Sequence, residues 1–323
     1  MNTFVTDISI APTWLWVTFT LGILVLLIVD LSLFGRGNQK VQTKSALIES
    51  GIWVAISLGF TAWFTVTFGT ELGLEFLTGY LVEKSLSVDN LFVILLVFSS
   101  FKIPDAYQHR VLFYGVLGAI ILRAIFILLG AHLLNSFHWV LYIFGFILVI
   151  TAIKFLRESD EKIDATENWS IKILKRIIPT TNKISGSNFF IKENGIRKAT
   201  PLFLALVVIE VTDLVFAVDS IPAVFAVTQD AFVAFASNIL AILGLRALYF
   251  VLADWVTKLR YLKPGLAAIL GFIGVKMLLV DFIKIPSWVS LLVIFAVLTT
   301  AGLSSWYVAQ IETRHKNKVD PFS

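Results

Sequence analysis

The chain has 323 residues, of which 58% are hydrophobic and only 15% are charged, and its mean hydropathy is +0.87. Average soluble domains are about 45–50% apolar and about 25% charged. A soluble enzyme, a disordered protein and a nucleic-acid-binding module are therefore excluded, despite the net charge of +4. The chain has no cysteine and only four histidines, so a bound metal would meet mainly oxygen ligands. Oxygen ligands favour hard cations such as Mn²⁺, Mg²⁺ or Ca²⁺.

Apolar segments long enough to cross a bilayer follow one another along the chain. A transmembrane helix needs about 20 mostly apolar residues. The first such segment lacks a basic flank before it and is too long for a cleaved signal peptide, so we expect it to be a span. The sequence predicts an all-α polytopic membrane protein with about nine transmembrane helices, at 13–34, 46–69, 76–101, 109–133, 138–157, 199–228, 231–253, 263–283 and 287–309.

The basic residues of the connecting segments indicate the orientation. If the N-terminus lies outside and the spans alternate, nearly all loop lysines and arginines fall on the cytoplasmic side, and the outer segments hold only Lys284. This asymmetry is the positive-inside pattern. We therefore expect a multi-pass protein of the cytoplasmic membrane with its N-terminus outside and its C-terminus in the cytoplasm.

Residues 158–198 form the only sizeable segment without a predicted span. They mix acidic and basic residues, followed by a stretch rich in Pro, Thr, Asn and Gly. We interpret them as a cytoplasmic loop with some helical character, within a single transmembrane domain that covers residues 1–323.

Two parts of the chain carry similar polar patterns. In both, an acid is followed after five residues by a second acid and then by an amide or a hydroxyl. The two runs are Glu83, Asp89 and Asn90 in the third span, and Asp213, Asp219 and Ser220 in the sixth. Similar runs spaced along a chain indicate an internal duplication.

The similarity continues into the following spans. Arg123 lies 31 residues before Lys154, and Arg246 lies 30 residues before Lys276. The repeat unit then contains three spans, and two consecutive units with an odd number of spans must be inserted with opposite orientation. We predict inverted repeats at 76–157 and 199–283, an arrangement in which secondary transporters hold a substrate near the bilayer midplane.

Charged residues inside the spans are too many to be incidental, because each costs about 2.5 kcal/mol or more at the bilayer centre. They must face the bundle interior, pair with one another, or line a wet path. The charges well inside the spans are Glu83, Lys84, Asp89, Arg123, Glu210, Asp213, Asp219, Arg246 and Lys276.

Helix geometry limits which of these can share one ion. Glu83 and Asp89 are six residues apart, about 120° around a helix, so both cannot point at one small ion from an unbroken helix. In the sixth span, Pro222 has no N–H for the carbonyl of Val218. We expect an unwound stretch there, with a free carbonyl beside the Asp219 carboxylate.

These residues predict an oxygen-rich site for a divalent cation. Such cations prefer about six oxygen ligands. The candidate ligands are Asp89, Asn90, Asp219, Ser220 and the Val218 carbonyl, with Glu83 or Asp213 nearby. We expect basic side chains to neutralise the carboxylates when no metal is bound, with Arg123, Arg246 and Lys276 in this role and Lys84 beside them. The same charges could instead be static buried ion pairs that fix the bundle.

The polar runs resemble those of the TerC family of bacterial inner-membrane proteins, and are most similar to its Alx branch. The resemblance rests on four runs and covers nearly the whole chain. The runs are 83–90 (EKSLSVDN), 114–119 (YGVLGA), 216–223 (FAVDSIPA) and 237–246 (SNILAILGLR).

The family is named for tellurium resistance and for its alkaline-induced member, and the resemblance implies a manganese exporter related to the LysE transporter superfamily. It implies that the acids of the transport path correspond to Glu83, Asp89, Glu210, Asp213 and Asp219. It supplies the identity of the metal and the bacterial inner membrane, whereas the residues alone predict only a hard-cation pathway.

We therefore expect a transporter that exports Mn²⁺ as its substrate and uses no organic cofactor, with protons as the candidate coupling ion. The alternative is a membrane scaffold or metal- or tellurium-stress component that acts on partner proteins through residues 158–198. An intramembrane aspartyl protease is disfavoured because neither Asp89 nor Asp219 follows a Gly-x-Gly pattern, and a retinal-type sensor built on Lys276 is disfavoured by the span number. The sequence leaves the coupling ion, the selectivity between Mn²⁺ and Fe²⁺, the oligomeric state and the pairing of the charges open.

Overall fold

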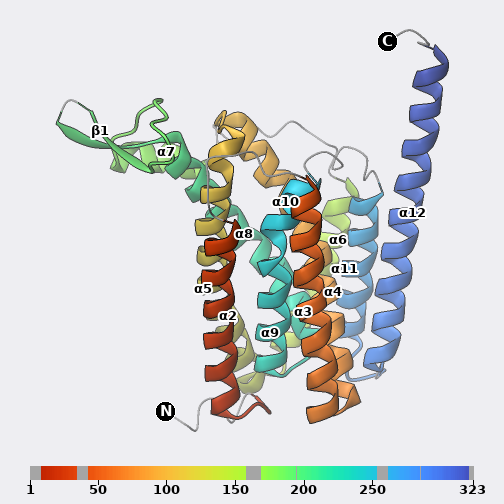
Figure 1. The fold of residues 1–323 in the computed structure, drawn as a ribbon. Helices are drawn as coiled ribbons and strands as arrows, with labels where there is room; N and C mark the ends of the chain where they lie inside the picture. Colours follow the sequence, from red (N-terminus) through yellow and green to blue (C-terminus); the bar gives the residue numbers. More distant parts are fainter. Residues whose placement is uncertain are drawn as a thin grey trace.

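The protein is described by a computed structural model that covers residues 9–34, 43–157, 169–193, 195–252, 261–283 and 285–319. It is a bundle of long, roughly parallel helices (Figure 1). The elements are α2 (Thr13–Phe34), α3 (Thr43–Phe68), α4 (Thr70–Ser100), α5 (Asp105–Ser136), α6 (Val140–Arg157), α7 (Trp169–Ile177), β1 (Phe190–Glu193), β2 (Ile196–Ala199), α8 (Pro201–Phe225), α9 (Ala231–Leu243), α10 (Leu245–Leu252), α11 (Leu262–Leu278) and α12 (Ser287–Val319).

Six stretches of helix in the described residues are long and apolar enough to cross a membrane. They are Lys44–Phe68, Asp105–Ser136, Val140–Arg157, Pro201–Phe225, Ala231–Val251 and Ser287–Val308. Helix α4 falls outside this set because its central part carries Glu83, Lys84 and Asp89, and α11 has only 17 residues. The mostly helical, polytopic fold agrees with the sequence, while the number of nine spans stays a prediction.

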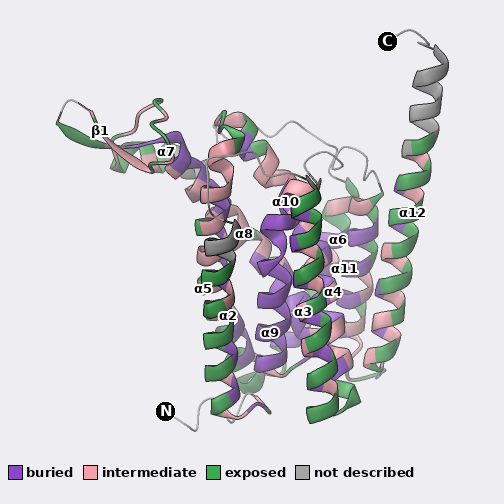
Figure 2. Cartoon of the chain, in the orientation of Figure 1, coloured by how far each residue is buried: buried purple, intermediate pink, exposed green. Residues whose placement is uncertain are grey.

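The helices pack in a pattern that encloses α9. Helix α6 lies along α11, α5 along α8, and α4 contacts both α8 and α9. Every residue of α9 is buried, as Figure 2 shows. Close approach of α4 is allowed by Gly79, where a Cβ atom would lie 2.9 Å from the Ser237 hydroxyl of α9.

Large apolar side chains on the outer helices point away from the bundle. Leu21 and Ile28 of α2, Phe146 of α6 and Trp306 of α12 are each more than half exposed, and Figure 2 shows exposed residues along α2, α3 and α12. A surface of this kind is stable against lipid tails rather than water. It follows that the bundle is solvated by a bilayer around its sides.

The break in the helices is not where the sequence predicts it. Helix α8 runs without interruption through Pro222, so the expected unwound stretch beside Val218 is wrong. A membrane helix tolerates proline when the surrounding packing holds the helix in place. The interruption lies instead at Gly244, where α9 ends and α10 begins.

The segment between α6 and α8 contains α7 and a two-stranded antiparallel hairpin, in which Phe190 of β1 faces Ala199 of β2. The hairpin is not predicted from the sequence, because strands of four residues are too short to show a clear alternating pattern. Residues 158–168 lie outside the described part of the chain. Both α7 and the hairpin lie at the end of the bundle at which α12 ends, opposite the end at which α2 begins (Figure 1).

Candidate functional site

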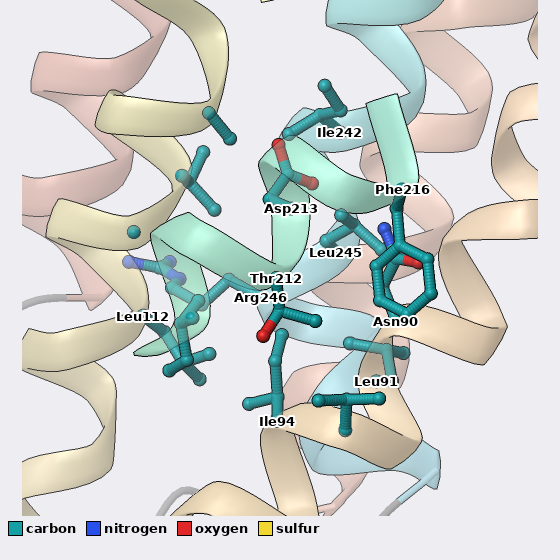
Figure 3. A pocket seen from close by; sticks show the side chains of 15 residues that line it. Asn90, Leu91, Ile94, Leu112, Thr212, Asp213, Phe216, Ile242, Leu245 and Arg246 are labelled. Atoms are coloured by element: carbon teal, nitrogen blue, oxygen red, sulfur yellow. The ribbon is translucent and has the colours of Figure 1, made fainter. Parts of the chain in front are cut away.

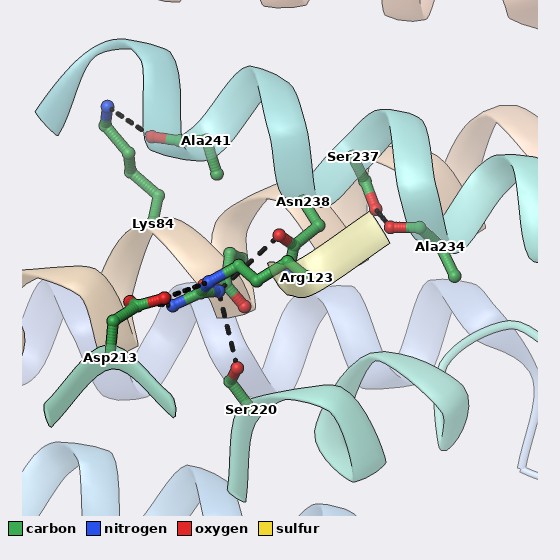
Figure 4. A network of polar contacts seen from close by, with 9 residues as sticks. Lys84, Arg123, Asp213, Ser220, Ala234, Ser237, Asn238 and Ala241 are labelled. Atoms are coloured by element: carbon green, nitrogen blue, oxygen red, sulfur yellow. Dashed lines mark hydrogen bonds and ion pairs between the residues drawn. The ribbon is translucent and has the colours of Figure 1, made fainter. Parts of the chain in front are cut away.

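A buried arginine joins three helices at the middle of the bundle. Arg123 of α5 donates from Nε and Nη2 to both carboxylate oxygens of Asp213 in α8, at 3.1 and 2.8 Å. Its Nη1 donates to Glu83 of α4. The same Nη1 lies 3.4 Å from the Ser220 hydroxyl and 3.5 Å from Oδ1 of Asn238 in α9 (Figure 4). The guanidinium therefore fixes α4, α5 and α8 around one point.

The Arg123 cluster, defined as Arg123, Glu83 and Asp213, holds one positive and two negative formal charges. The side chains of Arg123 and Glu83 are wholly buried, and that of Asp213 is 13% exposed. One carboxylate oxygen of Glu83, Oε2, is buried without a hydrogen-bond partner. A buried acceptor without a partner is costly, so this oxygen and the excess negative charge favour an additional donor or cation.

A small cavity adjoins the cluster. It is lined by the oxygen-bearing side chains of Glu83, Asn90, Asp219 and Ser220, together with Leu86, Phe155, Phe216 and Leu270. We call this the central cavity. Thr151 of α6 donates a hydrogen bond of 2.7 Å to Oδ1 of Asp219, which orients that carboxylate. The volume of about 10 Å³ admits roughly one water-sized probe.

A second cavity lies on the other side of Asn90 and Phe216, both of which line the two cavities. Its polar lining includes Asn90, Thr212, Asp213 and Arg246, and its other walls are mostly aliphatic (Figure 3). We call this the adjoining cavity. The acids Asp213 and Asp219 of α8 thus line two neighbouring cavities that share Asn90 and Phe216 as lining residues.

The second repeated arginine has a different environment. Nη2 of Arg246 donates to Oε1 of Glu49 in α3 at 2.6 Å, and Nη1 lies 2.9 Å from Nε2 of His109 in α5. We call Arg246, Glu49 and His109 the Arg246 cluster. Sequence reasoning missed Glu49 because it lies close to the end of a predicted span. The signal that could have identified it is an acid inside a span.

Lys84 pairs with backbone rather than with a carboxylate. Its Nζ donates to the Ala241 carbonyl at 3.1 Å (Figure 4). The break at Gly244 brings the two together, since a Cβ atom on Gly244 would lie 2.5 Å from Nζ. A charge-compensating role for Lys84 toward the acids stays a prediction.

Other predicted residues lie apart from the Arg123 cluster. The Glu210 carboxylate fits against Gly118 of α5, where a Cβ atom would come within 2.1 Å of Oε1, and its Oε2 has no hydrogen-bond partner. Lys276 donates to the Ser290 hydroxyl at 2.9 Å. Val218 has a side chain that is 51% exposed, although the prediction concerned its carbonyl oxygen.

The structure brings together only part of the predicted ligand set. Glu83, Asn90, Asp219 and Ser220 line one cavity, while the side chain of Asp89 lies outside the described part of the structure. Among the described residues, no three carboxylate or imidazole groups lie close enough together to hold one metal ion. The Arg123 guanidinium lies between Glu83 and Asp213 and pairs with both.

Comparison with known proteins decides the family. Residues 68–313 match the family described as "Integral membrane protein TerC family". The chain belongs to the TerC family. This confirms the resemblance seen in the four polar runs, and it makes the protein an integral, multi-pass membrane protein.

The chain is also similar along most of its length to individual members. It is 46% identical over 307 residues to "Uncharacterized membrane protein STKORF319" of Myxococcus xanthus, covering 95% of each chain. It is 46% identical over 308 residues to "Putative membrane-bound redox modulator Alx" of Escherichia coli K12, covering 92% of this chain and 96% of the relative. An uncharacterized membrane protein of Rickettsia felis is 44% identical over 290 residues, covering 90% and 96%. No solved structure matches the chain.

Proposed function

We propose that this TerC-family protein exports Mn²⁺ from the bacterial cytoplasm across the inner membrane, with the central cavity as the place where the ion binds. The observation that carries the proposal is the lining of that cavity by Glu83, Asn90, Asp219 and Ser220. Carboxylate, amide and hydroxyl oxygens are the ligands that hard divalent cations prefer.

In the proposed mechanism, the bound ion replaces Arg123 as the positive charge beside the carboxylates. With no ion bound, the guanidinium satisfies Asp213 and one oxygen of Glu83. An ion held by Asp219 and Glu83 supplies the positive charge that Arg123 supplied. Because Arg123 ties α5 to α4 and α8, release of its bonds loosens the contacts among those helices. In this proposal, ion binding changes which packing of the bundle is favoured.

The packing of the helices supports a symmetric transport cycle. If α4, α5 and α6 correspond to α8, α9–α10 and α11, then the α4–α9 contact has the α8–α5 contact as its counterpart, and α6 packs on its own counterpart α11. A two-fold relation between inverted units would produce this pairing. In such transporters one unit rocks against the other around the site.

The two cavities suggest the route. Asn90 and Phe216 line both the central cavity and the adjoining cavity, and Asp213 provides a carboxylate in the latter. The adjoining cavity has a volume of about 40 Å³, so neither cavity is open to a hydrated ion in this conformation. We propose that a rotation of Phe216 joins the two, and that protons are carried in the opposite direction.

The scaffold alternative is supported by one observation. Helix α7 and the β hairpin project beyond the edge of the bundle (Figure 1), where a partner could reach them. The Escherichia coli relative is named as a redox modulator. Since the present chain has no cysteine, any redox role here would not pass through a thiol of its own.

Flux measurements test the export proposal. The wild-type chain and the variants Asp219→Asn and Asp89→Asn are reconstituted into liposomes that enclose a Mn²⁺-sensitive dye. Asp281→Asn is the matched control, because Asp281 is an exposed acid that binds His138 and Tyr142 at the end of the bundle. We expect rapid Mn²⁺ entry with wild type and the control, and loss of flux in both test variants.

Two outcomes would overturn the proposal. If liposomes with the wild-type protein take up no Mn²⁺, the export proposal is wrong and the scaffold alternative is favoured. If all variants give the same flux as wild type, the assignment of the ion site to the central cavity is wrong. A flux that survives deletion of residues 158–198 argues against the scaffold. Dependence of the flux on an imposed pH gradient tests the coupling to protons.

A further inference from the structure

Helix α7 carries an exposed apolar pair that the proposed transport function does not use. Ile173 and Ile177 are 48% and 72% exposed, and they are four residues apart, so they lie on the same face of the helix. Leu174 turns inward and packs against a buried apolar cluster of the bundle. The exposed pair is therefore a ridge beside the packed face, rather than two scattered side chains.

Basic residues cover the rest of the exposed surface of α7. Lys175 and Arg176 are exposed. At 100° per residue, Arg176 lies on the side opposite Leu174 and Ile178, and Lys175 lies on the side opposite Ile173 and Ile177. Residues 169–200 contain seven basic residues and a single acid, Glu193. That acid is already paired, with Lys183 at 2.7 Å and Lys198 at 3.0 Å. The segment thus presents a strongly positive surface with apolar side chains in it.

The segment is attached firmly to the bundle. Nη1 of Arg110 in α5 donates to the Ser187 hydroxyl at 2.7 Å, and the guanidinium of Arg110 also lies over the ring of Phe189. The ring of Phe190 in β1 packs against the ring of Phe203 in α8 in a tilted arrangement, with ring centroids 4.6 Å apart. These contacts hold the segment that follows α7 on the bundle, and Leu174 packs α7 itself against the bundle.

That position is beside the bundle, near the level at which α5 and α8 begin (Figure 1). Helices α5 and α8 begin there with the residues that follow their polar connections, so this is the level of the lipid headgroups. A short helix with an apolar ridge and basic neighbours at this level matches an interfacial membrane helix. A basic surface at the headgroups is attracted by anionic lipids, not by zwitterionic ones.

We propose that α7 is a lipid-binding element, in which Ile173 and Ile177 enter the boundary between headgroups and acyl chains while Lys175 and Arg176 bind the phosphates of anionic lipids. The occupant of this surface is the adjacent bilayer, not a protein partner. The proposal does not depend on the transport of Mn²⁺.

Because the chain has no cysteine, a single substitution can be labelled uniquely. Ile177→Cys is labelled with an environment-sensitive fluorophore and placed in nanodiscs of phosphatidylcholine alone, or of phosphatidylcholine and phosphatidylglycerol in equal amounts. Some acyl chains carry a nitroxide that quenches the fluorophore on contact. Asn182→Cys, an exposed polar position of the same segment, is the control.

The label at position 177 is expected to be quenched strongly in the anionic discs and weakly in the zwitterionic ones, whereas the label at 182 is quenched in neither. Adding Lys175→Glu and Arg176→Glu to Ile177→Cys should lower the insertion equilibrium constant roughly thirtyfold or more, since each basic residue near an anionic surface contributes about one factor of five. Raised salt should weaken insertion of the parent in the same direction.

Two results would overturn the proposal. One is a label at 177 that is quenched no more than the label at 182 in both compositions, which leaves the surface facing water or a protein partner. The other is equal quenching in both lipid compositions with no effect of the charge reversals. That result would show that α7 does not recognise anionic headgroups. Retained near-ultraviolet circular dichroism of each variant establishes that it is folded.

Discussion

Arg123 and Arg246 occupy corresponding places in two similar sequence runs, yet the structure surrounds them differently. Arg123 contacts two carboxylates, Glu83 and Asp213, both from helices of the predicted repeats. Nη2 of Arg246 donates to the Glu49 carboxylate of α3, and Nη1 lies beside the His109 ring. Helix α3 lies outside both predicted repeats.

The difference lies in what surrounds each arginine. The Arg123 cluster contains the Glu83 oxygen that has no hydrogen-bond partner, and it adjoins the oxygen-lined central cavity. The pair of Arg246 and Glu49 connects α10 to α3, and a buried ion pair between helices can fix a fold. Our proposal therefore gives the Arg123 cluster an ion-binding part and the Arg246 cluster a structural part.

The largest expected effect is a difference in stability between two double variants, each of which removes both members of one ion pair. Arg246→Met with Glu49→Met replaces a buried ion pair by apolar side chains, which is often neutral for stability. Arg123→Met with Glu83→Met leaves Asp213 buried without its guanidinium. We expect the second double variant to lose about 3–5 kcal/mol of stability and the first less than about 1 kcal/mol.

Thermal unfolding in detergent, at constant protein and lipid content, measures this difference. The Arg123→Met single variant serves as a reference that leaves both Glu83 and Asp213 uncompensated and should be at least as unstable. Equal destabilisation by the two double variants would contradict the assignment of different roles.

A smaller effect is expected from Thr151, whose hydroxyl orients Asp219. Thr151→Val keeps the shape of the side chain and removes the donor. Hydrogen bonds to charged groups contribute about 1.5–3 kcal/mol, so the Mn²⁺ concentration for half-maximal flux should rise about tenfold or more. Thr151→Ser, which keeps the hydroxyl, should restore most of the affinity.

The matched control is Thr61→Val. Thr61 is also buried, but its hydroxyl bonds the Ser57 carbonyl of its own helix at 2.8 Å. A flux curve that shifts equally for Thr61→Val and Thr151→Val would mean that the shift reflects general packing and not the Asp219 carboxylate.

The smallest effect belongs to an ion-pair cluster outside the membrane. Hydrogen bonds from Lys183 and Lys198 hold the pKa of Glu193 at about 2, below its ordinary value of 4.5. A group whose pKa is lower in the folded state stabilises the fold above its ordinary pKa, and this contribution is lost as the pH falls. The hairpin should therefore lose stability between about pH 4.5 and pH 2 and stay constant between pH 6 and pH 8.

Hydrogen exchange of the β1–β2 amides, corrected for the intrinsic pH dependence of exchange, measures this change, and Glu193→Gln should abolish it. Because exposed ion pairs contribute little to overall stability, titration of Glu193 should not change the temperature at which the whole protein unfolds. A hairpin in Glu193→Gln that still loosens over the same pH range would show that another group is responsible.

The sequence correctly predicts a helical membrane protein and, through its polar runs, the family. Both predictions depend only on local composition and local sequence. It does not predict which charges meet. Arg123 lies 40 residues from Glu83 and 90 from Asp213, and the pairing depends on how α4, α5 and α8 pack. The pairing of Glu49 with Arg246 could not be predicted for the same reason, since the two residues lie 197 positions apart.

The helix break shows a second limit. Proline is the strongest local signal for a broken helix, yet α8 continues through Pro222 and the interruption falls at Gly244. There the Lys84 side chain meets the Ala241 carbonyl, so a distant lysine bonds a carbonyl near the end of the helix. Local propensity identifies where a helix can break, whereas tertiary contacts decide where it does.

Binding of Mn²⁺ to the purified protein tests the central claim most directly. Free Mn²⁺ gives a six-line electron paramagnetic resonance signal that shrinks as the ion binds, so wild type, Asp219→Asn and Glu49→Gln can be compared at equal concentrations. We expect wild type and Glu49→Gln to remove Mn²⁺ from solution with similar affinity, and Asp219→Asn to remove much less. Undiminished binding by Asp219→Asn, or an equal loss in both variants, would contradict a Mn²⁺ site in the central cavity.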